Sequence, residues 1–375
     1  MQRNLGLVAG YKANQDFYPP LSTVILYGAS RVSRSLDLTA VSGFKLSLFV
    51  FLLLATLALL VWTRNLMVAS LMHLSLTLNV MGLGYIDIYF APTLILALWA
   101  LERGRWFWFR LLFTVTCLVK WQPVVLVPFI IAYLLRQIGM RGPKGAGLKE
   151  LVIKAVLPCL WIAALVLGVF GFEMVRTLGR ANADERLSGN ALNFNWVLTH
   201  FYHMSSPERF GPWVGGRSDW ISTRQVKIVP LLKLAFVITY ATVLFAFLRR
   251  GNSFRNLLLF SLTGYLAYFI LNTGVHENHL FVACILGVLL CSVDPAFLGV
   301  AAAVALAANL NLLIFYGIDG RGLSFDRVVG VDMALVLSIV NVLLFGLLFY
   351  AVVKGWLAGV PESTDRASPQ ASRPC

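Results

Sequence analysis

Residues 44–63 read FKLSLFVFLLLATLALLVWT, an apolar run whose only charged side chain is Lys45. A helix of about 20 apolar residues is long enough to cross the hydrocarbon core of a bilayer. Four comparable runs follow it, over Leu151–Phe172, Pro230–Leu248, Ala296–Tyr316 and Val331–Val353. Together these runs place the chain among integral membrane proteins with several transmembrane helices.

The composition agrees with this class, because 59% of the 375 residues are hydrophobic, more than a soluble domain can bury. With the shorter apolar segments, the long runs predict about eleven crossings, several of which would border a cavity. The predicted fold is therefore all-α, a polytopic bundle of transmembrane helices. The shorter segments are Leu66–Leu83, Ile86–Leu101, Trp106–Val119, Gln122–Leu135, Asn256–Asn272 and Leu280–Ser292.

The net charge of +14 raises the question of nucleic-acid binding. Its distribution argues against that partner, because the basic residues gather in short loops at the ends of the apolar segments. This is the positive-inside pattern of membrane proteins, so we place these loops in the cytoplasm and expect the lipid bilayer as the partner. The residues are Arg103, Arg105, Arg136, Arg141, Lys144, Lys149, Arg249, Arg250 and Arg255.

Fixing these loops inside divides the chain into three parts. Residues 1–43 form an external N-terminal segment, and residues 44–354 form the transmembrane domain with an external loop over 173–229. Residues 355–375 form a cytoplasmic tail, rich in Ser, Pro and charge, that we expect to be disordered. The five cysteines have neither metal-ligand nor disulfide spacing, so we interpret them as buried thiols.

In the external N-terminal segment, Tyr18-Pro19-Pro20 forms a rigid, extended stretch of backbone that ends any preceding helix. The apolar residues from Leu21 to Val32 then recur at helical spacing, with Arg31 and Arg34 on the polar side, which predicts an amphipathic helix on the outer membrane surface. An ordinary connecting loop is the alternative. No signal peptide precedes the segment. Either its outward placement is wrong or the chain lacks a first helix that its relatives have, and we favour a truncated or misassigned start.

Two polar side chains stand at the outer ends of apolar segments. Asp87 opens a helix in GYIDIYFAP (84–92), where an acidic residue is an ordinary partner of the helix dipole. Lys120 lies in LVKWQPVVLVPF (118–129), where it either snorkels to the surface or faces a cavity and holds an anionic group such as phosphate. Gln122 offers an amide beside it.

A third polar cluster lies in GVHENHLF (274–281), between two apolar stretches. His276, Glu277 and His279 fall within a break of a few residues. Ionisable groups at membrane depth are costly, so they usually face a cavity and carry out chemistry or bind a charged ligand. Because no HExxH motif is present, phosphate binding or proton transfer suits this cluster better than metal chelation.

The external loop carries aromatic side chains next to polar ones. In RLSGNALNFNWVLTHFY (186–202), Asn193 precedes Trp196, and the apolar part over 191–202 is long enough only for a re-entrant or surface helix. Arg217 follows in the Gly-rich stretch GPWVGGRSDW (211–220). Aromatic rings beside polar groups are suited to binding sugar rings, but Trp is also common at membrane interfaces. Sugar binding and interface anchoring therefore both stay open.

The order of these motifs resembles a family. The chain reads YPPL (18–21), then GYID (84–87), RGR (103–105), KWQP (120–123), ALNFNW (191–196) and HENHLF (276–281). It thereby resembles the polyprenol-phosphate-dependent integral membrane glycosyltransferases of the GT-C class, and in particular bacterial mannosyltransferase-like proteins related to the GPI mannosyltransferases. The resemblance extends from about Tyr18 to Phe281.

The resemblance implies an enzyme at the outer face of the bacterial cytoplasmic membrane. It would take a sugar from a polyprenyl-phosphate donor, and mannose is the sugar that the resemblance favours. A carboxylate deprotonates the acceptor hydroxyl, which attacks the anomeric carbon with inversion. Some relatives use a divalent cation and others do not, so the question of whether this chain needs one as a cofactor stays open. A transporter or lipid flippase and an inactive truncated homologue are the alternatives. The implied roles are catalytic for Asp16 and Asp87, phosphate binding for Lys120, Gln122, His276, Glu277 and His279, and substrate binding for Tyr18, Asn193, Trp196 and Arg217.

Overall fold

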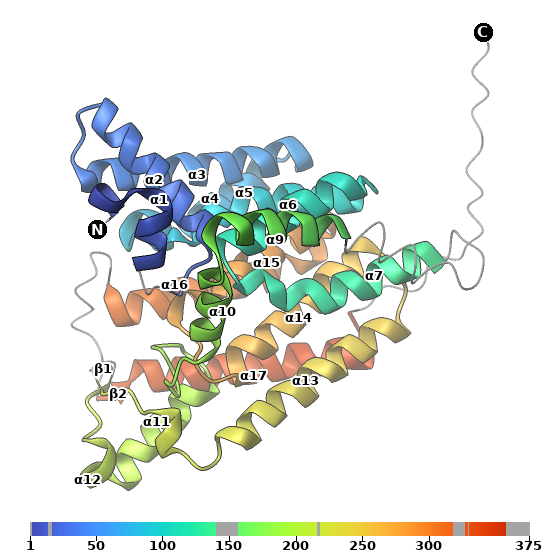
Figure 1. The fold of residues 1–375 in the computed structure, drawn as a ribbon. Coiled ribbons are helices and arrows are strands. Elements are labelled where there is room, and N and C mark those ends of the chain that lie inside the picture. The colour runs from blue at the N-terminus through green and yellow to red at the C-terminus, as the bar shows by residue number, and fades with distance from the viewer. Residues whose placement is uncertain are drawn as a thin grey trace.

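A computed structural model describes residues 2–13, 17–139, 157–215, 218–317, 327–328 and 330–357. Within these ranges the chain forms sixteen α-helices and one two-stranded ribbon of β1 (Arg327–Val328) and β2 (Val331–Asp332). The prediction of an all-α fold is confirmed, and Figure 1 shows the long helices running side by side.

Five helices are long and apolar enough to cross a membrane. A sixth span is added if α9 (Leu157–Phe170) and α10 (Glu173–Asn182), which meet at a bend of 105°, count as one. The prediction of about eleven crossings is therefore wrong for the described part of the chain. The five are α3 (Ala40–Thr63), α13 (Val229–Arg249), α14 (Phe254–Leu271), α16 (Leu298–Tyr316) with the turn before it, and α17 (Met333–Lys354).

The other predicted crossings form shorter helices. At about 1.5 Å per residue, helices of this length reach roughly 20 Å, short of the ~30 Å hydrocarbon core. Gly84, with a φ of +77°, and the 3-10 turns that contain Asp87 and Pro123 interrupt the apolar sequence and shorten them. They are α4 (Leu66–Thr77), α5 (Ala91–Glu102), α6 (Trp106–Val119), α7 (Val127–Gly139) and α15 (Leu280–Val293).

The N-terminal part forms α1 (Gln2–Ala13) and α2 (Pro20–Ser35). The helix predicted after the prolines is thus confirmed. It packs so closely on α3 that a Cβ atom at Gly43 would lie 1.3 Å from the Ser33 hydroxyl. The first crossing begins at Ala40, where the Thr39 hydroxyl accepts a hydrogen bond from the backbone of Ser42.

Basic side chains link the helix ends at one end of the bundle through hydrogen bonds and an ion pair. Arg136 donates to the carbonyl of Arg250 at 2.5 Å, and Arg250 donates to the carbonyl of Val353 at 3.0 Å. Arg255 forms an ion pair of 2.6 Å with Asp294. The ends of α7, α13, α15 and α17 therefore meet here. The predicted cytoplasmic residues Arg141, Lys144 and Lys149, and residues 358–375 of the tail, lie outside the described ranges.

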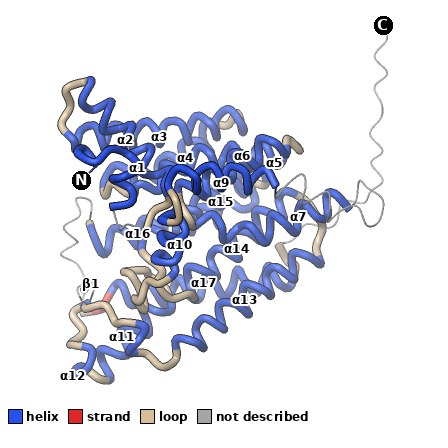
Figure 2. The backbone as a smooth tube through the Cα atoms, viewed as in Figure 1, coloured by secondary structure: helices blue, strands red, loops and turns tan. Residues whose placement is uncertain are grey.

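The opposite end holds most of the irregular backbone (Figure 2). Here α11 (Phe194–Ser205) and α12 (Pro207–Phe210) follow the loop that leaves α10, and α11 confirms the short helix predicted in the external loop. The helices α14 and α15 form the centre of the core, and nearly all their side chains are buried. The polar break between these two central helices opens at the irregular end.

Candidate active site

Asp87 and Lys120 meet at the irregular end of the bundle. Asp87 lies in the 3-10 turn Ile86–Phe90, and Lys120 is the first extended residue after α6. Its Nζ atom is 2.9 Å from Asp87 Oδ1, and the two residues are 8% and 0% exposed. Asn278 donates to the other carboxylate oxygen at 2.7 Å. Asp87 is thus held from both sides.

Lys120 also contacts the N-terminal segment. Its ammonium group lies 4.4 Å from the centre of the Tyr18 ring, in a cation–π contact. Two residues further on, Gln122 is buried, and neither its amide nitrogen nor its amide oxygen has a hydrogen-bond partner among the described residues. Buried polar atoms are almost always paired, so this amide is suited to binding a ligand or water.

A second pair, between Asp184 and His276, lies at the same end. Asp184 Oδ2 is 2.6 Å from His276 Nε2, and the backbone N–H of Arg186 donates to Asp184 Oδ1 at 3.0 Å. Burial raises the pKa of Asp184, but the hydrogen bonds from His276 and Arg186 outweigh burial and hold the pKa below its usual value. A carboxylate that fixes an imidazole in this way is a common proton-accepting unit.

Backbone contacts hold this pair together. The N–H of Gly189 donates to the carbonyl of Val275 at 2.8 Å, and the N–H of Glu277 donates to the carbonyl of Gly189 at 3.1 Å. A Cβ atom at position 189 would lie 2.6 Å from His276 Nδ1, so only glycine fits against the imidazole. The external loop therefore lies directly on the HENH segment.

The other two residues of the HENH segment bind tyrosine side chains, while Asn278 links the segment to Asp87. Glu277 accepts a hydrogen bond from Tyr85, and His279 Nδ1 lies 3.1 Å from the Tyr268 hydroxyl. The rings of His276 and His279 are 5.4 Å apart. The sequence thus correctly predicts that Asp87, Lys120 and the HENH residues gather at one end of the bundle.

Asn193 and Trp196 lie beside this cluster but are fully buried. Asn193 caps α11 and donates to the carbonyl of Phe269 at 2.9 Å, while the Trp196 ring packs against Phe315 at 4.9 Å. These contacts attach α11 to the core, and a direct role of either residue in substrate binding stays a prediction. Asp16 and Arg217 lie outside the described residues.

Sequence reasoning missed Asp184, Tyr85 and Asn278. Asp184 is 92 positions from His276, and the local sequence ANADERLSG gives no signal of chemistry. The described ranges hold no group of three or more His, Cys, Asp or Glu side chains that could bind a metal ion. A role for a divalent cation therefore stays a prediction without a set of ligands.

The fold defines the class of protein: an integral, multi-pass membrane protein with several apolar helices. No protein-family model matches the chain, and no curated protein is detectably similar to it. Any more specific function must therefore be argued from the geometry of the site.

Proposed function

We propose that the protein is a membrane glycosyltransferase. It transfers a sugar, for which mannose is our first candidate, from a polyprenyl-phosphate donor to an acceptor hydroxyl, with inversion at the anomeric carbon. One observation carries the proposal: the buried Asp87–Lys120 pair, the Asp184–His276 pair and a second histidine, His279, gather at one end of an apolar bundle. Polar groups at such a position are costly unless they serve a ligand. We place the enzyme in a bacterial cytoplasmic membrane, with this end outside.

The leaving phosphate needs positive charge and hydrogen-bond donors as the glycosidic bond breaks. Lys120 supplies the charge. Gln122, two residues further along the chain, offers a buried amide that has no hydrogen-bond partner among the described residues. Asp87 is fully buried and held by Lys120 and Asn278, which suits a residue that positions Lys120 better than one that accepts a proton.

The Asp184–His276 pair is better suited to proton transfer, because both side chains are partly exposed. The acceptor oxygen forms a bond to the anomeric carbon, and the bond from that carbon to the phosphate oxygen breaks. The proton of the acceptor hydroxyl passes to the pair, and the phosphate leaves with the electrons of the broken bond. Asp16, the other predicted base, stays a candidate for the same role.

A transporter or lipid flippase is the second candidate, because paired charges inside a membrane bundle also mark transport pathways. The Asp87–Lys120 pair is the observation in its favour. Such a protein would move a lipid-linked sugar without cleaving it, so product analysis separates the two functions. An inactive homologue would do neither.

The test uses membranes containing the full chain and radiolabelled polyprenyl-phosphate mannose. We expect sugar transfer by the native chain and a loss of about 10²–10⁴-fold in Asp184→Asn and His276→Gln, the usual contribution of a general base. Glu185→Gln is the matched control, because Glu185 is the next residue and pairs with Arg224 at the surface. No transfer by the native chain would reject the transferase; transfer with full activity in both variants would reject only the assignment of the base.

Full activity in Asp16→Asn would remove Asp16 from the candidates. Loss in that variant alone would move the base from Asp184 to Asp16.

A further inference from the structure

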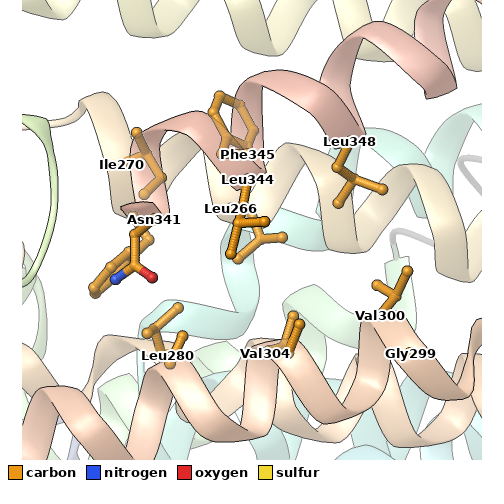
Figure 3. Close-up of a pocket in the computed structure, with 13 residues that line it drawn as sticks. Leu266, Ile270, Leu280, Gly299, Val300, Val304, Asn341, Leu344, Phe345 and Leu348 are labelled. Carbon is orange, nitrogen blue, oxygen red and sulfur yellow. The ribbon is translucent and has the colours of Figure 1, made fainter. Parts of the chain in front are cut away.

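A groove of about 200 Å³ lies between the central core and two candidate membrane spans. In Figure 3, α16 and α17 face each other across it, with α14 behind. Its lining consists of Leu266, Phe269 and Ile270 of α14, Leu280 of α15, Gly299, Val300, Ala303, Val304 and Ala307 of α16, and Asn341, Leu344, Phe345 and Leu348 of α17.

The groove is suited to hydrocarbon. Among the residues that the structure describes, Asn341 is the only polar side chain in its lining. The floor is buried, with Phe269 and Leu280 at 1% and 2% exposure. Gly299 and Leu344 at the mouth are exposed, so the groove opens sideways between α16 and α17. Because both helices are candidate membrane spans, we expect this opening to face the acyl chains of the bilayer.

One end of the groove adjoins the candidate active site. Leu280 directly follows His279 in the chain, and Figure 3 shows Leu280, Ile270 and Asn341 at the same end. Asn341 donates to the carbonyl of Leu192, the residue before Asn193, at 2.9 Å. The groove therefore begins at the residue after the HENH segment and extends into the apolar part of the bundle.

We propose that this groove binds the hydrocarbon tail of the lipid-phosphate donor, with the phosphate at Lys120 and the HENH histidines. The inference rests on the proposed function. From Gly299 to Ala307 the wall is about 12 Å long at 1.5 Å per residue. It therefore holds only the part of a polyprenyl tail nearest the phosphate, and the rest of the tail stays in the bilayer.

Two glycines allow a matched pair of variants. Gly299 lines the groove and Gly346 lies on an exposed part of α17 outside it. A Cβ atom at either position meets no other atom within 4 Å. Gly299→Leu therefore fills the groove without a backbone clash, while Gly346→Leu adds the same side chain elsewhere. Ala303→Phe is a second groove-filling variant on α16.

The probe is a polyprenyl phosphate that carries a photoreactive diazirine in its first isoprene units and no sugar. The full chain in lipid nanodiscs is irradiated with it, and the labelled peptides are identified by mass spectrometry. We expect labels on α14, α16 and α17. We expect about tenfold weaker labelling in Gly299→Leu and Ala303→Phe, a change of about 1.4 kcal/mol in binding. Gly346→Leu should label as the native chain does.

Unlabelled polyprenyl phosphate should compete with the probe, and phosphatidic acid, which has two acyl chains, should not. Unchanged labelling in both groove variants, or equal competition by phosphatidic acid, would overturn the proposal. No sugar transfer occurs in this experiment. A protein that binds the probe here but fails the transferase assay would therefore contradict the proposed function alone.

Discussion

The ammonium group of Lys120 lies 2.9 Å from the carboxylate of Asp87, at a point where the carboxylate has no contact with solvent. The two residues come from separate breaks in the apolar sequence, and each stands at the end of a short helix. Neither charge would be tolerated at this depth alone, because burial removes the hydration free energy of the ion and contacts with apolar atoms do not replace it. Each residue therefore depends on the other.

Asp87→Asn should destabilise the protein by about 3–5 kcal/mol, because it leaves a buried lysine without its counter-charge. The double variant Asp87→Asn/Lys120→Met should recover part of this loss, since no unpaired charge remains. Thermal unfolding of the purified protein in detergent measures both effects. Equal midpoints for the single and double variants would show that the pair is not coupled.

Gly189→Ala should damage the active site through a single methyl group. The added Cβ atom would lie 2.6 Å from the imidazole of His276, so the ring must move away from Asp184. Overpacking of this kind typically costs about 1–3 kcal/mol. We expect sugar transfer to fall much as it does in His276→Gln, although both members of the pair are still present.

Gly179→Ala is the control for this change, because a Cβ atom at Gly179 meets no other atom within 4 Å. Native activity in Gly189→Ala would mean that the contact between His276 and Asp184 is not needed for transfer.

The long crossings could be predicted from the sequence almost to the residue. The run from Phe44 to Thr63 belongs to a helix over Ala40–Thr63, and the run from Val331 to Val353 to a helix over Met333–Lys354. The shorter segments misled the count of crossings, because their apolar composition equals that of a membrane span. Glycine, proline and 3-10 turns, such as those at Gly84 and Pro123, divide them into helices enclosed by others.

The candidate site could be predicted only where its residues stand out locally. Lys120 and the HENH residues are charged or titratable groups within apolar sequence, which makes them conspicuous. Asp184 lies in a polar loop, where an aspartate has no special meaning. It joins His276 only because the loop lies on the HENH segment through backbone hydrogen bonds at Gly189. No local pattern encodes that contact.

The lowered pKa of Asp184 predicts how stability changes in acid. A carboxylate with a folded-state pKa below its unfolded value, about 3.9 for Asp, stabilises the fold above that value. This contribution is lost as the pH falls through the lower folded-state pKa. The unfolding temperature of the native chain should therefore fall more steeply than that of Asp184→Asn below about pH 4. Parallel curves from pH 7 to 3 would exclude a stabilising contribution from this contact.

The orientation of the bundle can be tested with two cysteines placed at opposite ends. The loops with Arg103, Arg249 and Arg255 predict that the basic end faces the cytoplasm. Trp356, which is 71% exposed, follows α17 at that end, and Glu208 lies exposed in α12 at the other. In a chain whose five native cysteines are replaced by serine, Glu208→Cys should react with a membrane-impermeant maleimide on intact cells.

Trp356→Cys should react only after the cells are permeabilised, because its end of the bundle is inside. Both substitutions leave every basic residue in place, so neither alters the charge pattern that sets the orientation. Reaction of Trp356→Cys in intact cells, with Glu208→Cys protected, would invert the assignment. The candidate active site would then face the cytoplasm, and a donor presented at the outer face could not reach Lys120.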